Sequence, residues 1–177
     1  MKATGIVRRI DDLGRVVIPK EIRRTMRIRE GDPLEIYTEN DGSVVFRKYS
    51  QIGEMSRVSS EYAEAINRSS GIPIAICDRD SVIAVAGVSR KEYLEKPISS
   101  GLSSVLSTRK SYSAGEKGVD VTVTEGGTEV SYLSPIVNEG SVIGAVMSLK
   151  RDGLAPDGSE KKLIDTGAYF ISSQTNV

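Results

Sequence analysis

The 177-residue sequence contains no histidine, no tryptophan and one cysteine, Cys77. Without histidine there is no imidazole base or metal ligand, and one cysteine forms neither an intrachain disulfide nor a cysteine-cluster zinc site. No hydrophobic run approaches the roughly 20 residues that span a bilayer, and the N-terminus lacks an apolar signal segment. No paired-carboxylate or nucleophile motif is present either. We therefore expect a cytoplasmic protein, not an enzyme, with no cofactor, no metal and no membrane association.

Charge is distributed unevenly along the chain, although the formal net charge is zero. Residues 1–29 carry nine Lys and Arg against three acidic residues, a net charge of +6. Residues 1–50 have a net charge of +3 and residues 51–177 a net charge of −3. This asymmetry predicts two modules with different partners, the first of which binds a polyanion.

The first module, residues 1–50, reads as strand, turn, strand, helix and hairpin. Gly14 ends the first turn, where we expect a positive φ, and Pro19 stands where a helix can begin. Asp41-Gly42 between two β-rich runs is a strong hairpin signal. The expected elements are strands at 3–10 and 15–18, a helix at 20–28, and a hairpin of strands at 34–38 and 43–47.

Fifty residues cannot bury a large core, because small domains leave most of their surface exposed. Neither a disulfide nor a metal compensates in this sequence. We therefore expect residues 1–50 to form an obligate homodimer with interleaved hairpins.

Residues 51–70 form the joint between the modules. Apolar residues recur there at spacings of three and four, which predicts an amphipathic helix. Two interpretations remain open: a helix packed on its own domain, or a seam between two chains that extends the dimer.

Gly71 is expected to end the helix of residues 51–70, and the second module, residues 71–177, begins there. The order of its expected elements predicts an α+β fold, an antiparallel sheet with helices mainly on one face. Ser159 is the expected N-cap of the last helix. The expected strands span 72–78, 82–88, 119–124, 129–137 and 141–149, and the expected helices span 91–109, interrupted at Pro97, and 159–174.

The basic residues of the first module are the candidate binding residues. Two copies in a dimer would present a broad positive surface that contacts phosphates and guanine edges. No aromatic residue interleaves with the arginines, which favours duplex DNA over single strands. A solvated charged face is the alternative, but three acidic residues cannot neutralise nine bases. The candidate DNA-binding residues are Arg8, Arg9, Arg15, Lys20, Arg23 and Arg24.

The run from Gly5 to Arg24, continued by Gly31–Tyr37 and Val44–Tyr49, resembles the swapped-hairpin DNA-binding domain of AbrB-type transition-state regulators. The resemblance implies a dimeric β-barrel of interleaved hairpins, with DNA contacts at Arg8, Arg15, Arg23 and Arg24 and with Arg9 and Lys20 as helpers. It also implies tolerance of sequence and readout of DNA shape. With its second module, the chain is similar to regulators of late sporulation in spore-forming Bacilli, acting as activator or repressor.

The second module is similar to a GAF domain, a sensory α+β fold, and is expected either to bind a small molecule or to assemble the protein without one. Ser99, Ser100, Ser103 and Tyr112 are candidate pocket residues, whereas Asp78 and Asp80 are read as a solvated hairpin turn. A homotetramer is plausible because the terminal helices have apolar stripes to bury. A DNA-binding autoregulator of the antitoxin type is the rival interpretation, but an antitoxin normally carries a disordered tail.

Overall fold

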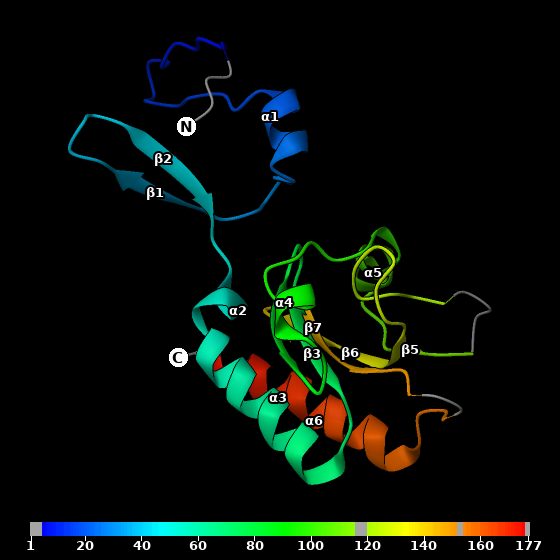
Figure 1. Cartoon of the computed structure of the whole chain (residues 1–177). Coiled ribbons are helices and arrows are strands. Elements are labelled where there is room, and N and C mark those ends of the chain that lie inside the picture. Colours follow the sequence, from blue (N-terminus) through cyan, green and yellow to red (C-terminus); the bar gives the residue numbers. More distant parts are fainter. Residues whose placement is uncertain (1–4, 116–119, 152–153, 176–177) are drawn as a thin grey trace. The chain divides into compact units, whose positions relative to one another are not determined.

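The computed structural model describes residues 5–115, 120–151 and 154–175 and divides into two compact units that meet between Tyr49 and Ser50 (Figure 1). The division follows the change in charge along the sequence.

The N-terminal unit contains one helix and one hairpin, α1 (Lys20–Thr25), β1 (Leu34–Thr38) and β2 (Val44–Lys48). The strands are antiparallel and place Ile36 opposite Phe46. Gly42 closes the turn with a φ of 84°, and the Asp41 carboxylate accepts a hydrogen bond from the Ser43 amide at 2.8 Å. The predicted hairpin is therefore confirmed.

The strands predicted at 3–10 and 15–18 are wrong for the single chain. Residues 3 and 4 lie outside the described residues, and residues 5–18 contain a turn but no strand. A strand needs a backbone partner, and β1 and β2 already pair with each other. The apolar side chains of this segment stay in solvent, with Val7 91% and Val17 68% exposed.

Helix α1 ends at Thr25, three residues earlier than predicted. Arg27 follows with a φ of 52°, and the amides of Arg27 and Ile28 bond back to the carbonyls of Arg24 and Arg23 at 3.3 and 2.7 Å. These two bonds form a Schellman motif, with an arginine where glycine is usual. Nothing in the sequence marks Arg27 for this left-handed position.

The second unit is built on a five-stranded antiparallel sheet in the order β4-β3-β7-β6-β5. It opens with two helices, α2 (Gln51–Glu54) and α3 (Ser56–Ser70). Gly71 ends α3 with a φ of 70°, as predicted. The strands are β3 (Ile74–Asp78), β4 (Val82–Ala86), β5 (Tyr112–Ser113), β6 (Val130–Asn138) and β7 (Ser141–Leu149).

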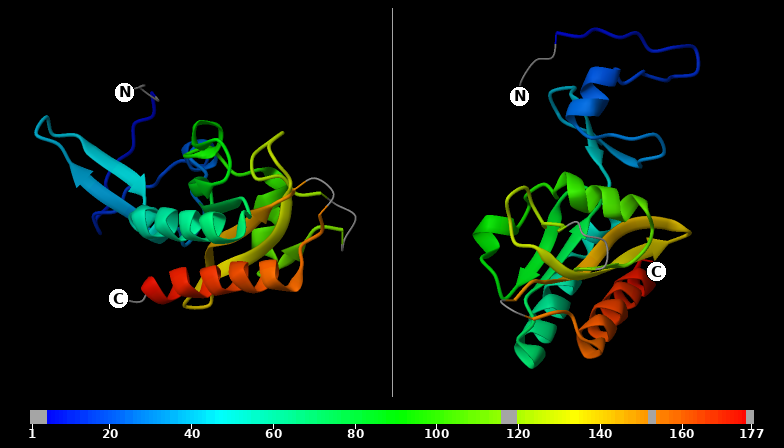
Figure 2. Two further views of the ribbon diagram at one scale, coloured as in Figure 1. Left: turned by 60° about the horizontal axis from the view of Figure 1, so that its bottom comes forward. Right: turned by 90° about the vertical axis from the view of Figure 1, so that its right-hand side faces the viewer.

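Both faces of this sheet are covered (Figure 2). Helices α3 and α6 (Gly158–Gln174) lie side by side on one face, where the Tyr62 hydroxyl donates to the Leu163 carbonyl at 2.7 Å. Ile164 and Ile171 of α6 are fully buried against this face. The opposite face packs against α5 (Ser100–Ser107) and the loop before β6. The α+β class, with an antiparallel sheet flanked by helices, is confirmed.

The interruption expected at Pro97 in the helical stretch 91–109 is confirmed, because Pro97 separates two helices, α4 (Arg90–Tyr93) and α5. Two other features of this unit differ from the prediction. Residue 119 lies outside the described residues, and residues 120–124 make only an isolated bridge from Thr122 to Glu129 instead of a strand. The short strand β5 had no signal in the sequence.

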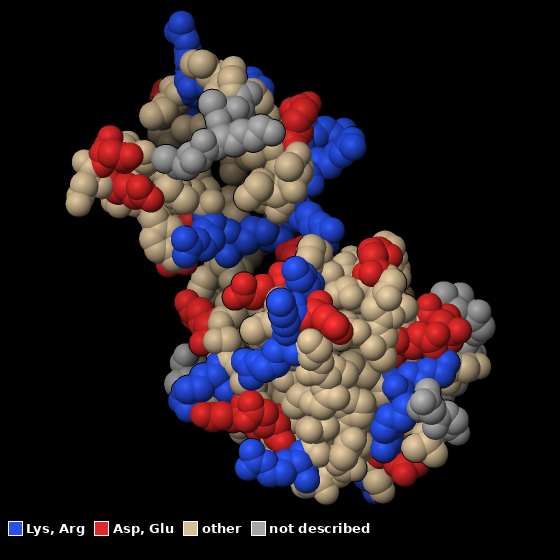
Figure 3. All heavy atoms as spheres, in the orientation of Figure 1, with Lys and Arg blue, Asp and Glu red and all other residues tan. Residues whose placement is uncertain are grey.

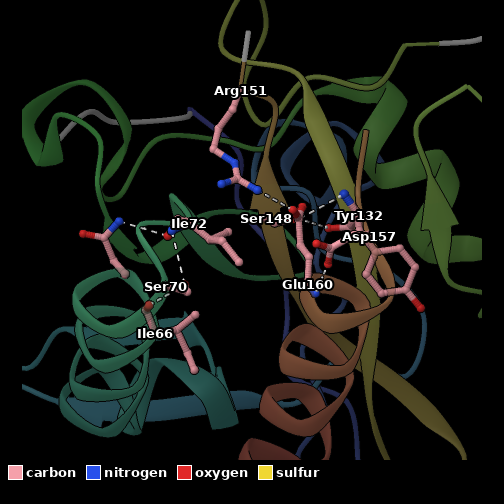
Figure 4. A network of polar contacts seen from close by, with 9 residues as sticks. Ile66, Ser70, Ile72, Tyr132, Ser148, Arg151, Asp157 and Glu160 are labelled. Atoms are coloured by element: carbon pink, nitrogen blue, oxygen red, sulfur yellow. Dashed lines mark hydrogen bonds and ion pairs between the residues drawn. The ribbon is translucent and has the colours of Figure 1, made fainter. Parts of the chain in front are cut away.

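The N-cap of α6 is Asp157 rather than Ser159, because its carboxylate accepts the Glu160 amide hydrogen bond at 2.7 Å. Glu160 itself is only 2% exposed and accepts hydrogen bonds from Ser148 at 2.6 Å and Arg151 at 2.7 Å (Figure 4). The Ser148 hydroxyl also accepts from the Tyr132 amide at 3.2 Å. This network anchors the start of α6 to the centre of the sheet.

Candidate nucleic-acid interface

The turn after residue 10 is organised by one carboxylate. Asp11 accepts hydrogen bonds from the backbone amides of Leu13 at 3.0 Å and Arg15 at 2.7 Å. The backbone closes the same turn through Gly14 N to Asp11 O at 3.0 Å. Gly14 has a φ of 77°, which confirms the predicted positive φ and suits glycine because a Cβ is unfavourable there.

The turn also holds the side chain of Arg15. Its Nε donates to the Asp11 carboxylate at 2.8 Å. The Arg15 backbone and side-chain hydrogen bonds lower the pKa of Asp11 below its ordinary value. Arg15 keeps four further N–H donors and stays well exposed, so it can contact a phosphate while it remains paired with Asp11.

Arg8 and Arg9 lie on the extended segment before this turn. Both are exposed, and neither has an ion pair or hydrogen bond with any other residue in the described ranges. Residues 5–10 form no strand in the single chain, so strand alternation does not assign either arginine to a face.

Helix α1 carries Lys20, Arg23 and Arg24, all of them exposed. Arg23 and Arg24 lie in the last turn of this short helix, where the negative end of the helix dipole favours cations. None of the three has an ionic partner among the residues that the structure describes. They are therefore free to meet an anionic ligand.

A partly buried ion pair lies at the end of α1 and was missed by the sequence reasoning. Lys48 Nζ lies 3.2 Å from the Asp32 carboxylate and donates to the Arg27 carbonyl at 3.0 Å. Asp32 also accepts the Arg29 amide hydrogen bond at 2.8 Å. Lys48 thus ties the loop after α1 to β2, and the separation of these residues in sequence left no local signal to find it.

The tip of the β1–β2 hairpin is an acidic part of the N-terminal unit. In the view of Figure 3, acidic side chains gather at the tip of the β1–β2 hairpin, where Glu39 and Asp41 lie. Basic side chains occupy other parts of its surface. An anionic ligand would therefore avoid the hairpin tip.

The candidate pocket residues of the second unit have other roles. Ser99 is buried and caps α5, accepting the Leu102 amide hydrogen bond at 3.0 Å and donating to the Thr122 carbonyl at 2.6 Å. Ser100 is exposed, and Tyr112 is buried in the core. Neither these residues nor Ser103 line the cavity considered below.

Asp78 works as a turn residue. Its carboxylate accepts hydrogen bonds from the amides of Asp80 at 2.8 Å and Ser81 at 2.7 Å, as the hairpin interpretation requires, and from the Ser50 hydroxyl at 2.8 Å. Across residues 5–115, 120–151 and 154–175, no group of three or more His, Cys, Asp or Glu residues is arranged to hold a metal ion. In the same ranges no helix is long and apolar enough to cross a bilayer.

An exposed arginine-rich unit joined to a packed α+β domain is typical of a DNA-binding regulator with a second domain. Comparison with known proteins shows the family to which the chain belongs. Residues 54–176 match the family model "Stage V sporulation protein T C-terminal, transcription factor", and residues 7–54 match "Antidote-toxin recognition MazE, bacterial antitoxin". The first match covers more than half of the chain.

The chain belongs to the stage V sporulation protein T family. It is 49% identical over 176 residues to stage V sporulation protein T of Bacillus subtilis, covering 98% of both chains. Over 49 residues, it is also 59% identical to the B. subtilis transition state regulatory protein AbrB. This match covers 28% of this chain and 50% of that protein.

The fold of the second unit is shared with a methyl-accepting chemotaxis protein fragment. That match has a TM-score of 0.53 at 16% identity and covers 70% of this chain and 92% of that one. Together the matches identify a DNA-binding transcription regulator of sporulation, as predicted, and do not favour the antitoxin interpretation.

Proposed function

We propose that the first 50 residues bind duplex DNA through two copies of one arginine set. The observation that carries the proposal is that the arginines on α1 and on the segment before the Asp11 turn are exposed and have no ionic partner among the described residues. Phosphate contacts by such side chains give affinity without base specificity. The contact residues are Arg8, Arg9, Arg15, Lys20, Arg23 and Arg24.

The uncovered apolar surface of this unit supports a homodimer. Ile36 and Phe46 face each other across the hairpin and are 62% and 42% exposed. Val7 and Val17 add more exposed apolar surface from the segment without strands. A second copy of the same unit covers these side chains and supplies backbone partners for residues 5–18, which the resemblance to swapped hairpins also implies.

The remaining parts of the chain have supporting roles. Residues 51–70 couple the two modules, and residues 71–177 sense a ligand or assemble two dimers into a tetramer. The protein has no catalytic activity and acts in the cytoplasm on the nucleoid, as activator or repressor according to the promoter. Its DNA sites are defined by shape more than by a strict consensus.

Fluorescence anisotropy with a labelled DNA duplex over a series of salt concentrations tests the DNA contacts. Four arginines on each of two protomers engage about eight phosphates, so log K against log salt is expected to fall with a slope of about −7. The variant R8A/R15A/R23A/R24A is expected to lose binding while its circular dichroism spectrum and its oligomeric state stay unchanged.

Arg68→Ala is the matched control, because Arg68 is an exposed arginine of α3 with no ionic partner among the described residues. It is expected to bind DNA as the parent protein does. Unchanged affinity in the quadruple variant would overturn the assignment of these arginines to DNA.

A further inference from the structure

The second unit contains a cavity of about 380 Å³ between α2, α3, β4 and α4. We propose that this cavity binds a small organic anion with an apolar body and a single carboxylate or phosphate head. None of its lining residues belongs to the N-terminal unit. The lining residues are Gly53, Ser56, Arg57, Ser60, Val82, Ile83, Arg90, Leu94 and Glu95.

Two arginines reach this cavity from different elements. Arg57 comes from the first turn of α3, and Arg90 is the first residue of α4. A guanidinium group presents five N–H donors in a planar fork that matches a carboxylate or phosphate. Arginines from two elements around one hollow can hold one anionic head between them.

The ion pairs of Arg57 and Arg90 leave further N–H donors of both guanidinium groups available. Arg57 donates to Glu61 at 2.7 Å and Arg90 to Glu64 at 3.4 Å. Both pairs are exposed, and exposed ion pairs are worth little in water. Each guanidinium uses one nitrogen in the pair, so a ligand can engage the remaining donors or replace the glutamate.

Serine hydroxyls add polar groups to the same wall. Ser56 and Ser60 are one helical turn apart on α3, and both line the cavity. Neither hydroxyl has a hydrogen-bond partner within the described part of the chain. Both can donate to an anionic head that the arginines attract.

The other lining residues limit the class of ligand. The half-buried side chains of Ile83 and Leu94 supply apolar surface, which suits a ligand with a hydrocarbon body. Glu95 also lines the cavity, and its backbone amide donates to the Val82 carbonyl at 2.8 Å. Its negative charge disfavours polyanions such as nucleoside triphosphates. A singly charged head is therefore the best match.

The cavity also lies against the segment that follows the DNA-binding unit. Gly53 belongs to α2, which begins two residues after Tyr49. Ser50 caps α2, accepting the Gly53 amide hydrogen bond at 3.0 Å and donating to Asp78 of β3. A ligand here contacts the helices through which the proposed sensing domain connects to the DNA-binding unit.

Isothermal titration calorimetry on the intact protein tests the proposal with three probes. The probes are 3-phenylpropionate, phenyl phosphate and the neutral 3-phenylpropionamide. At least one anion is expected to bind and the amide is expected not to bind. The two anions distinguish a carboxylate head from a phosphate head. Absence of binding by both anions would overturn the proposal.

Matched variants locate the binding site. R57Q/R90Q is expected to lower the affinity for the anionic probe at least about tenfold, because each charged hydrogen bond lost is worth that much or more. R68Q, on the same helix but outside the cavity, is expected to leave affinity unchanged. R23Q/R24Q is also expected to leave it unchanged, so loss of binding there would place the anion on the DNA-binding unit and refute the proposal.

The competing carboxylates give a test in the opposite direction. E61Q/E64Q removes the carboxylates that pair with Arg57 and Arg90, and it is expected to raise the affinity for the anionic probe several-fold. Equal or weaker binding in this variant would contradict the role given to the two arginines. DNA affinity of R57Q/R90Q without probe is expected to match the parent, so this test fails or succeeds independently of the proposed DNA contacts.

Discussion

The two units of this chain differ in how much of their apolar surface they bury. Among the residues that the structure describes, eleven of the fifteen exposed large apolar side chains belong to the N-terminal unit, although it is much the shorter one. Both hydrophobic core clusters found in these residues lie in the second unit. The second unit is a domain with its own core, whereas the described part of the first has a hairpin, a helix and a turn without a core cluster.

The difference explains how one chain can combine a broad binding surface with a stable scaffold. A unit that completes its core with a second copy also duplicates its arginines, which doubles the number of phosphate contacts. The second unit has its own core, which leaves its remaining surface for the proposed sensing or assembly. The predictions below test this contrast, starting with the largest effect.

A charge placed on the uncovered hairpin face is expected to have the largest effect. Ile36→Asp would bury a carboxylate in the proposed dimer core, which costs several kcal/mol. We expect DNA affinity to fall about a hundredfold or more in fluorescence anisotropy, with the N-terminal amides losing hydrogen-exchange protection. Glu35→Gln, on the opposite face of β1, is the control and is expected to bind DNA normally.

A substitution that removes core side-chain volume from the second unit is expected to lower stability without weakening DNA binding. Leu133 is fully buried in the core beneath α5, and Leu133→Ala is expected to cost about 2–5 kcal/mol of unfolding free energy. Urea denaturation measures this loss as a change in the free energy of the second unit's unfolding transition. DNA affinity is expected to stay near the parent value at low temperature. Val137→Ala, at an exposed site, is expected to change stability by less than about 1 kcal/mol.

The Asp11 turn offers an intermediate effect. Gly14→Val forces a β-branched residue into a left-handed conformation and is expected to destabilise the N-terminal unit by about 1–2 kcal/mol. Gly158→Ala is the control, because Gly158 lacks a positive φ and a Cβ there meets no atom within 4 Å. A melting temperature of Gly14→Val equal to the parent's would argue against the described turn.

The smallest expected effect is a pH dependence of the same turn. The pKa of Asp11 is lowered chiefly by the Arg15 backbone hydrogen bond and next by its side-chain bond. The ionised carboxylate is thus favoured in the folded turn, and its contribution is present above the ordinary pKa of 3.8 and lost as the pH falls through the lowered value.

Carboxyl-detected NMR titration measures this shift directly. Asp11→Asn is expected to remove the acid sensitivity of the Leu13 and Arg15 amides. Asp41, whose pKa is lowered mainly by the Ser43 hydroxyl, is the internal reference in the same unit. An unshifted Asp11 titration would contradict the hydrogen bonds described for the turn.

The sequence predicted the local features that glycine and proline impose. Gly14, Gly71 and the Asp41-Gly42 hairpin follow from backbone preferences that need no tertiary information, and Pro97 divides the helical pattern of 91–109. The resemblance to AbrB-type regulators supplied the class of protein. These signals depend on neighbours in the sequence, which is why they could be predicted.

Some features escaped prediction, for different reasons. The Lys48–Asp32 pair joins residues far apart in the sequence, so no local pattern marks it. The left-handed Arg27 and the Asp157 N-cap are local, but glycine is usual at the first position and Ser159 is an equally suitable capping residue type at the second. The strands at 3–10 and 15–18 were predicted from apolar patterning, but a strand forms only where a partner strand exists.

Native mass spectrometry of the intact protein, with Ile36→Asp alongside it, tests the central claim most directly. The claim is that the N-terminal unit completes its core by pairing with a second copy. The account predicts a dimer or tetramer for the parent protein and assemblies of half that size for Ile36→Asp. A monomeric parent protein, or identical assemblies for the two proteins, would contradict it.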